Sequence, residues 1–439
     1  MCHLFVCRKM KYEEAMDYIK NYRSTGISLG LDRMKELCFR LGNPENRLAF
    51  VHVAGTNGKG STAAYISSIL GTSGLLVGRY VSPVVFQYEE CIQFEDSHGI
   101  TYIDSELLAE VVSEVANVVE EMKQEGFEQP TIFEVETAMA FLAFVKKQCQ
   151  IVVLEVGLGG SEDATNVIQN VVASVITPVS MDHMGILGDT LTEIATQKAG
   201  IIREGVPVIS FQTEPLVREV LKQTAFDRKC ALYFVEEEDI QKVSSNLNGN
   251  IFYYKQECYE SGMTGSYQIS NACLAIETCT QLKHIIEPDD LQMIAGIRNA
   301  VWPGRFEVIS SAPLIVVDGA HNPGAAEALA ESVKSLLPNR KIHGIMGCFR
   351  DKEYDKIINI MCPVLEDIVT VTAPTERGLE AEKLAKMWKK AGIKKIYIEK
   401  SVQEGLGKAL ELYQDGEAIV IFGSLSLLSK ANMVNCAIG

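Results

Sequence analysis

A glycine-rich turn between an apolar run and a helix-compatible segment constrains the fold of this chain more than any other feature. Residues 49–54 are largely apolar, and residues 59–70 contain no proline. An apolar run that passes through glycines into such a segment predicts a strand, a tight turn and a helix. The turn and the first residues of the helix are, in order, Gly55, Thr56, Asn57, Gly58, Lys59, Gly60, Ser61 and Thr62.

The turn has the chemistry of a phosphate-binding loop. Glycines let backbone N–H groups approach phosphate oxygens, a helix N-terminus favours negative charge, and a lysine adds a cation. The spacing departs from the standard P-loop, because Gly60 separates Lys59 from Ser61 and no glycine lies four residues before Gly58. A purely structural turn is the alternative. The strand before and the helix after favour the phosphate site, and we predict an ATP-dependent enzyme.

Strands and helices alternate along most of the chain. Short runs rich in β-branched residues are separated by segments with apolar residues at helical spacing. This alternation implies a parallel sheet covered by helices on both faces. Before residue 300 the predicted strands are 75–80, 151–154, 171–176, 206–209 and 231–235, and the predicted helices are 107–122, 133–145, 271–279 and 291–298.

A junction between two domains is expected near residue 302. At 439 residues the chain is too long for one ordinary core. Trp302, Pro303, Gly304 and Arg305 follow one another, and proline next to glycine marks a break in regular structure. We therefore predict one domain over 1–300 and a smaller Rossmann-like domain over 301–439. The strands expected in the second domain are 314–317, 342–346, 368–371, 396–398 and 418–421.

Composition excludes several classes of protein. A formal net charge of -16 argues against sequence-independent nucleic-acid binding, which needs basic surface. The 12 cysteines form no Cys-x-x-Cys pair, which favours reduced thiols in a cytoplasmic protein over disulfides or a zinc site. Charged residues interrupt every long apolar run, so we expect no membrane span, and the apolar run at 1–9 is too short for a signal peptide.

Ionisable side chains follow several predicted strands of the first domain. Glu155 ends one strand before a glycine loop, where a carboxylate can hold Mg²⁺. Asp182 and His183 follow the next strand and suggest metal or phosphate handling. Lys198 lies in a helical segment. The alternatives are an acidic residue that closes a strand, a structural histidine and a solvated lysine.

In the second domain, ionisable side chains again follow a predicted strand. Arg305 follows the junction, and Asp318 and His321 follow a strand. Arg305 is a candidate for stabilising a transferring phosphoryl group, and Asp318 for binding a ribose hydroxyl. An ATP held between the domains would explain why both carry such loops.

The order of these motifs resembles the folylpolyglutamate synthase/dihydrofolate synthase family, a branch of the Mur ligase superfamily. The resemblance runs from Leu29 to Leu425. The stretches that carry it are 29–33, 52–61, 82–83, 133–134, 154–160, 163–166, 182–183, 198–201, 302–305, 318–323 and 422–425.

The resemblance implies a role for each matching residue. The loop from Thr56 to Thr62 binds ATP, with Asn271, Arg305, Asp318 and His321 as further contacts. The catalytic residues implied are Lys59, His183, Lys198 and Arg305. Mg²⁺ is held by Ser82, Glu155, His183 and Lys198, whose amine is carbamylated in this superfamily. The folate substrate lies near Leu29, Asp32, Arg33, Thr131, Phe133, Glu134, Glu162, Asp163 and Ala164.

The implied fold is a P-loop ATPase domain with a parallel sheet, followed by a Rossmann-like α/β domain. The implied reaction activates a folate carboxylate with ATP as an acyl phosphate, which the amine of L-glutamate then attacks. The acceptor is tetrahydrofolate, dihydropteroate or both, and we expect a monomer. The chain departs from the family at Ser161 and Glu162, where arginine and leucine are usual, and at Cys91, where a Glu-Arg pair usually ends.

Three alternatives remain. One is dihydrofolate synthase activity alone. Another is a Mur-type ligase that acts on a cell-wall precursor, but the phosphate loop begins only about fifty residues into the chain, which leaves no room for an N-terminal UDP-binding domain. The third is a non-catalytic ATP switch, which has no need for the retained set of Glu155, His183, Lys198, Arg305 and Asp318.

Overall fold

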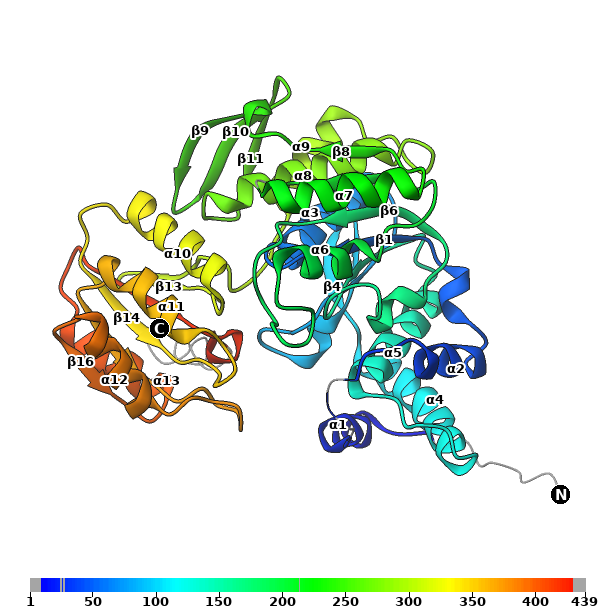
Figure 1. Ribbon diagram of the computed structural model, residues 1–439, viewed down its shortest axis with the longest axis horizontal. Coiled ribbons are helices and arrows are strands. Elements are labelled where there is room, and N and C mark those ends of the chain that lie inside the picture. The colour runs from blue at the N-terminus through cyan, green and yellow to red at the C-terminus, as the bar shows by residue number, and fades with distance from the viewer. Residues whose placement is uncertain (1–8, 24–25, 27, 213, 429–439) are drawn as a thin grey trace. The chain divides into compact units, whose positions relative to one another are not determined.

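The computed structural model describes residues 9–23, 26, 28–212 and 214–428. The segment 1–9, which was judged too short for a signal peptide, lies outside the described residues apart from its last residue. The chain divides into two compact units (Figure 1). The first unit comprises the chain up to Pro83, Tyr88–Glu237 and Asn271–Asn299. The second unit comprises Val84–Gln87, Glu238–Ser270 and the chain from Ala300 onward.

The first unit is built on an eight-stranded sheet with the order β4-β3-β2-β5-β1-β6-β7-β8. The strands from β2 to β8 in this order pair in parallel, and β3 and β4 add an antiparallel edge. The central strands are buried along their whole length, as expected where helices cover both faces. The strands are β1 (Phe50–Ala54), β2 (Val77–Tyr80), β3 (Ile92–Asp96), β4 (Gly99–Tyr102), β5 (Ile151–Glu155), β6 (Val171–Ile176), β7 (Val208–Ser210) and β8 (Leu232–Phe234).

The helix that follows the phosphate loop, α3 (Lys59–Thr72), is buried along most of its length. It contacts β2, β3 and β5 on one side and α9 (Asp290–Asn299) on the other. Gly296 of α9 packs directly against Ile69, where a side chain would not fit. The other helices up to residue 281 are α1 (Tyr12–Asn21), α2 (Asp32–Arg40), α4 (Ser105–Gln124), α5 (Ile132–Lys146), α6 (Leu191–Ala199), α7 (Pro215–Asp227) and α8 (Tyr267–Gln281), with 3-10 turns η1 (Pro44–Arg47), η2 (Tyr88–Cys91) and η3 (Ala164–Val167).

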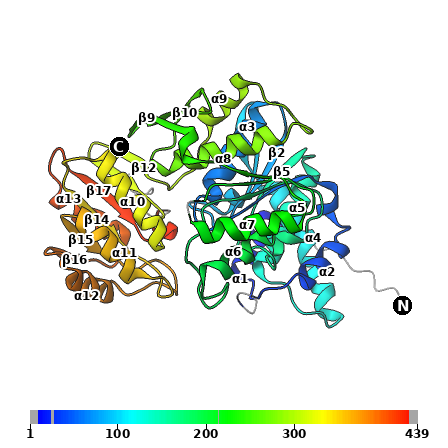
Figure 2. The ribbon, with the colours of Figure 1, turned by 45° about the horizontal axis from the view of Figure 1, so that its top comes forward.

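The second unit contains a six-stranded sheet with the order β12-β13-β17-β14-β15-β16, in which only the edge strand β12 is antiparallel among the described strands. Alternate residues of β17 face opposite cores: Val420 joins one cluster and Ile421 the other. Figure 2 shows α10 to α13 beside the strands. The elements are β12 (Glu307–Ser311), β13 (Leu314–Val317), α10 (Pro323–Leu336), β14 (Ile342–Met346), α11 (Tyr354–Met361), η5 (Cys362–Val364), β15 (Asp367–Thr370), α12 (Ala381–Ala391), β16 (Ile396–Ile398), α13 (Val402–Leu412) and β17 (Ala418–Phe422).

A separate three-stranded antiparallel sheet also belongs to the second unit. The side chain of Thr264, which follows it, hydrogen-bonds the carbonyl of Phe306, and Leu247 packs against the core there. These contacts explain why 238–270 group with the second unit, whereas the sequence placed the whole of 1–300 in the first domain. The strands are β9 (Ile240–Asn246), β10 (Gly249–Tyr254) and β11 (Glu257–Ser261), after the 3-10 turn η4 (Glu237–Asp239).

The predicted fold class is confirmed: both large sheets are mainly parallel and lie in α/β units. The antiparallel strands β3, β4 and β9 to β12 were not predicted, and two of them, β9 and β11, are largely polar and carry no apolar run. The nine cysteines in the described part of the chain are free thiols. In the same part, no helix is long and apolar enough to cross a membrane.

Candidate active site

The phosphate loop needs glycine at two positions. Gly55 has φ +149°, and an added Cβ would overlap the side chain of Thr177, which follows β6. Gly58 has φ +88°, and an added Cβ would overlap the amide oxygen of Asn271, near the start of α8. Both conformations are ones that L side chains rarely adopt. The loop therefore lies against Thr177 and Asn271, of which Asn271 was expected near the nucleotide.

Hydrogen bonds hold the loop to the segment after β6. The N–H of Thr56 donates to the carbonyl of Pro178 at 2.9 Å. Its hydroxyl donates to the carbonyl of Ser180 at 3.0 Å and accepts from the N–H of Ser180 at 3.1 Å. The segment leads directly to Asp182 and His183, so the geometry connects these two sequence motifs. Neither Thr177 nor Ser180 had been given a role, because nothing in their spacing marks the contact.

The side chain of Lys59 lies over its own loop. Its Nζ donates to the carbonyls of Gly55 and Thr56, each at 3.3 Å. The same Nζ lies 4.0 Å from Oε1 of Glu155, the last residue of β5. Val53 of β1 pairs with Glu155, so the carboxylate and the loop share the carboxyl edge of the sheet. Ligands bind at this edge in open α/β sheets.

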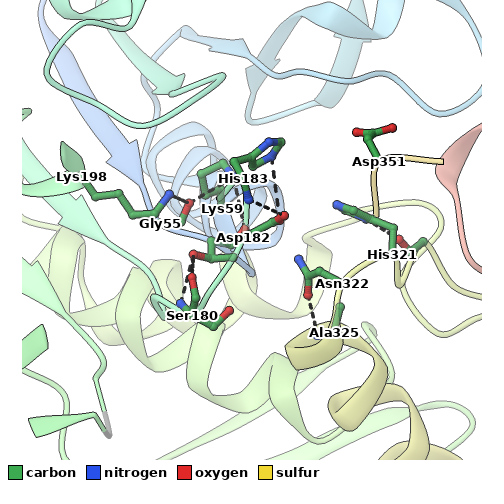
Figure 3. A network of polar contacts seen from close by, with 12 residues as sticks. Gly55, Lys59, Ser180, Asp182, His183, Lys198, His321, Asn322, Ala325 and Asp351 are labelled. Carbon is green, nitrogen blue, oxygen red and sulfur yellow. Dashed lines mark hydrogen bonds and ion pairs between the residues drawn. The ribbon is translucent and has the colours of Figure 1, made fainter. Parts of the chain in front are cut away.

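The side chain of Lys198 also points to the carbonyl of Gly55 (Figure 3). Its Nζ donates to the carbonyl of Gly55 at 2.8 Å, from near the C-terminus of α6. The residue is only 5% exposed. Burial, together with the positive charge of Lys59, lowers the pKa of Lys198 to about 7. This excludes the solvated lysine that the sequence left open, and a large share of the amine is neutral near neutral pH.

Asp182 and His183 form a compact turn. His183 has φ +53°, and its N–H donates to Oδ1 of Asp182 at 2.9 Å. Its Nε2 lies 3.8 Å from Oδ2 of the same residue. Ser82 follows β2, the neighbour of β5, and therefore lies toward the same sheet edge as Glu155. Among the described residues, no three His, Cys, Asp or Glu side chains form a group that could hold a metal.

The residues predicted near the substrate are joined by hydrogen bonds. Nε of Arg33 lies 3.1 Å from Oε2 of Glu134, and the N–H of Gly30 donates to the carbonyl of Glu162 at 3.3 Å. Thr131 and Glu134 cap α5 reciprocally. Oε1 of Glu134 is buried and has no hydrogen-bond partner among the described residues. The loop of Leu29, the start of α2 at Asp32 and the start of α5 thus meet beside Glu162.

Phe133 fills the space beside a glycine of the next loop. Its ring would overlap a Cβ on Gly157, and it packs against Tyr80 with ring centroids 6.1 Å apart. Ser161, one of the departures from the family pattern, donates to Oε1 of Gln197 at 2.5 Å, and its N–H donates to the Gln197 carbonyl at 2.9 Å. The serine therefore ties this loop to α6.

Asp163 uses both carboxylate oxygens inside the loop. Oδ2 accepts from the N–H of Leu158 at 2.8 Å, and Oδ1 accepts from the N–H of Thr165 at 3.0 Å. Burial raises the pKa of the Asp163 carboxyl, although these hydrogen bonds oppose the shift. Asp163 therefore orders the segment around Ala164, which begins η3.

The second unit holds the other predicted residues. Oδ2 of Asp318 accepts from the N–H of Phe306 at 2.8 Å and from the hydroxyl of Tyr267 at 3.1 Å. Burial raises the pKa of Asp318, and the charge of Arg305 opposes the shift. Nδ1 of His321 lies 2.8 Å from the carbonyl of Gly319. The role of Tyr267 was missed, because a tyrosine fifty residues away carries no local signal.

The chain matches two family models, Mur ligase middle domain over residues 53–279 and Mur ligase, glutamate ligase domain over residues 304–425. It is 37% identical over 356 residues to the dihydrofolate synthase/folylpolyglutamate synthase of Bacillus subtilis (strain 168), which covers 79% of this chain and 82% of the relative.

Two solved structures are similar over nearly the whole chain. The folylpolyglutamate synthase of Mycobacterium tuberculosis complexed with ADP is 28% identical, with a TM-score of 0.87 and coverage of 97% of this chain and 98% of that chain. E. coli FolC in complex with DHPP and ADP is 26% identical, with a TM-score of 0.84 and coverage of 98% of each chain.

Proposed function

We propose that this chain, which belongs to the folylpolyglutamate synthase/dihydrofolate synthase family, joins L-glutamate to a folate with the energy of ATP. It is an ATP-dependent acid–amino acid ligase of the Mur type. The observation that carries the proposal is the convergence of Lys59 and Lys198 on the carbonyl of Gly55, beside Glu155. A loop that only closed a strand would have no need for two amines and a carboxylate at its edge.

The chemistry begins with transfer of the γ-phosphoryl group of ATP to a folate carboxylate. The bond from the γ-phosphorus to the bridging oxygen breaks, ADP leaves, and an acyl phosphate forms. The amine of L-glutamate then attacks the acyl carbon, phosphate leaves with its bonding electrons, and the nitrogen loses one proton to give the amide. Phosphoryl transfer depends on positioning and charge neutralisation. The N–H groups of the loop and the ammonium of Lys59 supply both.

For Mg²⁺, we propose Ser82, Glu155, His183 and Lys198 as the residues that hold the ion. The unmodified amine of Lys198 is a donor and does not suit a cation. With a pKa of about 7 it is neutral often enough to combine with CO₂, and the carbamate that forms offers anionic oxygens. The donor set then consists mainly of oxygen, as Mg²⁺ prefers. A bound Mg²⁺ would neutralise charge on the ATP phosphates.

For the pteridine ring of the substrate, we propose the region where Arg33, Glu134 and Glu162 meet. The unpartnered Oε1 of Glu134 offers an acceptor to the N–H groups of a pterin edge. The remaining proposed substrate contacts are Leu29, Asp32, Thr131, Phe133, Asp163 and Ala164. Because Asp163 is engaged within its loop, its contribution is to hold neighbouring backbone in place.

We further propose that the second unit contributes Arg305, Asp318 and His321 to nucleotide binding, and that the enzyme acts as a monomer. The acceptor is a reduced folate, dihydropteroate or both, with dihydrofolate synthase activity alone as the alternative. A ligase for a cell-wall precursor is disfavoured because the relative at 37% identity is a dihydrofolate synthase/folylpolyglutamate synthase.

The test is phosphate release from ATP in the presence of Mg²⁺. We expect release only when a pteroyl acceptor and L-glutamate are both present. Dihydropteroate and tetrahydrofolate are assayed separately, and product mass shows whether one glutamate has been added. Phosphate release that needs neither substrate would contradict the proposal.

A further inference from the structure

A buried chain of hydrogen bonds connects the strand before the phosphate loop to the loop after β5. His52 lies on β1, three residues before Gly55, and is fully buried. Its Nε2 lies 2.9 Å from Oγ1 of Thr165. The hydroxyl of Thr165 donates to Oδ1 of Asp163 at 2.5 Å. Asp163 in turn accepts from the backbone N–H of Leu158.

The positions of the hydrogens in this series of hydrogen bonds follow from the groups at its two ends, Asp163 and His52. Both oxygens of Asp163 accept from backbone N–H groups, which can only donate, so the Thr165 hydroxyl gives its hydrogen to the carboxylate. The Thr165 oxygen then accepts from an Nε2–H of His52. Burial and the charge of Arg203 lower the pKa of His52 to about 3, so the ring is neutral and Nδ1 carries no hydrogen.

This series of hydrogen-bonded polar side chains is unusual because it lies in the buried interior. His52 and Thr165 are both inaccessible to solvent, and Nδ1 of His52 has no hydrogen-bond partner among the described residues. A buried polar group without a partner destabilises a fold, and apolar side chains of similar size would avoid that cost. A polar network in such a place therefore favours one specific arrangement of the elements that it connects.

We propose that His52 and Thr165 are positioning residues for the ligase reaction. They hold the loop from Gly157 to Asn166, which includes Glu162 and Ala164, in register with the strand that carries the phosphate loop. Phosphoryl transfer requires the folate carboxylate to meet the γ-phosphate at close range, and a small misplacement of one reactant lowers the rate strongly. The inference rests on the proposed function for the identity of the substrate beside this loop.

The first test replaces Thr165 with an isostere. Thr165→Val keeps the volume and removes the hydroxyl, and Thr165→Ser restores it. We expect Thr165→Val to lower kcat/KM for the folate about tenfold or more, as for loss of a buried hydrogen bond, with the affinity for ADP within about twofold of wild type. Thr165→Ser should recover most of the loss.

A matched control is Thr278→Val in α8. Thr278 is equally buried, but its hydroxyl donates only to the carbonyl of Leu274, one turn earlier in the same helix, at 2.7 Å. The Thr278→Val variant should leave kcat/KM for the folate unchanged. The rate of amide hydrogen exchange in the peptide 157–166 should also stay the same. An equal effect of Thr278→Val and Thr165→Val would show a general loss of stability and would overturn the proposal.

The second test uses His52. His52→Gln keeps an N–H donor near the position of Nε2, and His52→Leu does not. We expect His52→Leu to resemble Thr165→Val, and the double variant to be no worse than either single variant, because both break the same chain. Additive losses would show that the two residues act independently and would refute the coupling.

A readout independent of turnover separates this inference from the proposed function. Amide hydrogen exchange of the peptide 157–166 should be faster in Thr165→Val than in wild type and Thr165→Ser, because the N–H groups of Leu158 and Thr165 lose their fixed acceptor. If wild type fails to ligate glutamate to a folate, the proposed function fails while the exchange result still stands. Unchanged exchange in Thr165→Val contradicts the inference whatever the substrate is.

Discussion

Lys59 and Lys198 direct their side-chain amines at one atom, the carbonyl oxygen of Gly55, at 3.3 and 2.8 Å. Burial makes it costly to charge the amine of Lys198, and the positive charge of Lys59 at the same carbonyl adds to that cost. The balance lowers the pKa of Lys198 to about 7. A large share of the Lys198 amine is therefore neutral near neutral pH, and variants of each lysine separate their roles.

Lys198→Ala should lose activity that small carboxylic acids partly restore. The truncated side chain leaves a space beside Gly55 in which acetate or formate can replace the anionic end of a carbamate. Turnover is measured with rising acetate at constant ionic strength. Wild-type activity in the variant without acetate would discard the carbamate hypothesis, and chloride in place of acetate controls for salt.

The buried amine should also make stability depend on pH. The pKa of Lys198 is 10.5 in its ordinary environment and about 7 in the folded chain, so the unfolded state binds more protons between these values. Stability from this group therefore rises with pH across that window, and below it the folded state bears the cost of a buried charge. Lys198→Met removes this contribution.

The check is urea unfolding of wild type and Lys198→Met at about pH 6.5 and about pH 9.5 in carbonate-free buffer. The free energy of unfolding of wild type minus that of the variant should increase with pH. A constant difference would mean that the pKa of Lys198 is not lowered. Other titrating groups cancel in the comparison.

Lys59→Ala should reduce turnover by about a hundredfold or more, since it removes a cation from the phosphate loop. We expect weaker binding of ATP by calorimetry, with the thermal midpoint of unfolding nearly unchanged. Lys222→Ala is the matched control, because Lys222 is exposed on α7. Full activity of Lys59→Ala would refute the role given to the loop.

A comparison of Gly58→Ala with Gly74→Ala separates the effect of backbone strain from the effect of a steric clash. Both glycines have φ near +90°, at +88° and +95°, but only at Gly58 does a Cβ overlap a neighbour, Asn271. Each change should cost about 1 kcal/mol or more of stability through strain. Only Gly58→Ala should weaken ADP binding, by about tenfold or more, because the loop must move away from Asn271. Equal ADP affinities in the two variants would contradict this account.

The sequence predicted most of the buried strands, because β-branched apolar runs such as 171–176 and 314–317 are recognisable from local sequence. It did not predict β9 and β11, whose residues are mainly polar, and it also missed β10, which lies between them, although residues 251–254 are apolar or aromatic. The glycines of the phosphate loop were recognisable in the sequence, and two of them have a positive φ in the structure. Because Glu155 ends a predicted strand, it was expected at the same sheet edge, and it lies beside Lys59 of the loop.

Long-range partners were beyond the reach of sequence reasoning. The contact between Lys198 and Gly55 spans more than a hundred residues, and so do those of Arg33 with Glu134 and His52 with Thr165. His52 on β1 and Gly55 just after it reach their partners because β1 lies between β5 and β6 in the sheet, an order that differs from the order along the chain. The resemblance to a family named Lys198, but only the geometry explains its lowered pKa.

The insertion of β9 to β11 has a consequence for synthesis on the ribosome. The chain enters the second unit at Val84, Glu238 and Ala300, and it returns to the first at Tyr88 and Asn271. The first unit therefore waits for α9, the partner of α3, until about two thirds of the chain has emerged. Residues 238–270 leave the ribosome well before β12 to β17, with which they group. Cutting the gene at codon 300 would therefore keep all segments of the first unit in one fragment, but it would separate 84–87 and 238–270 from the rest of the second unit.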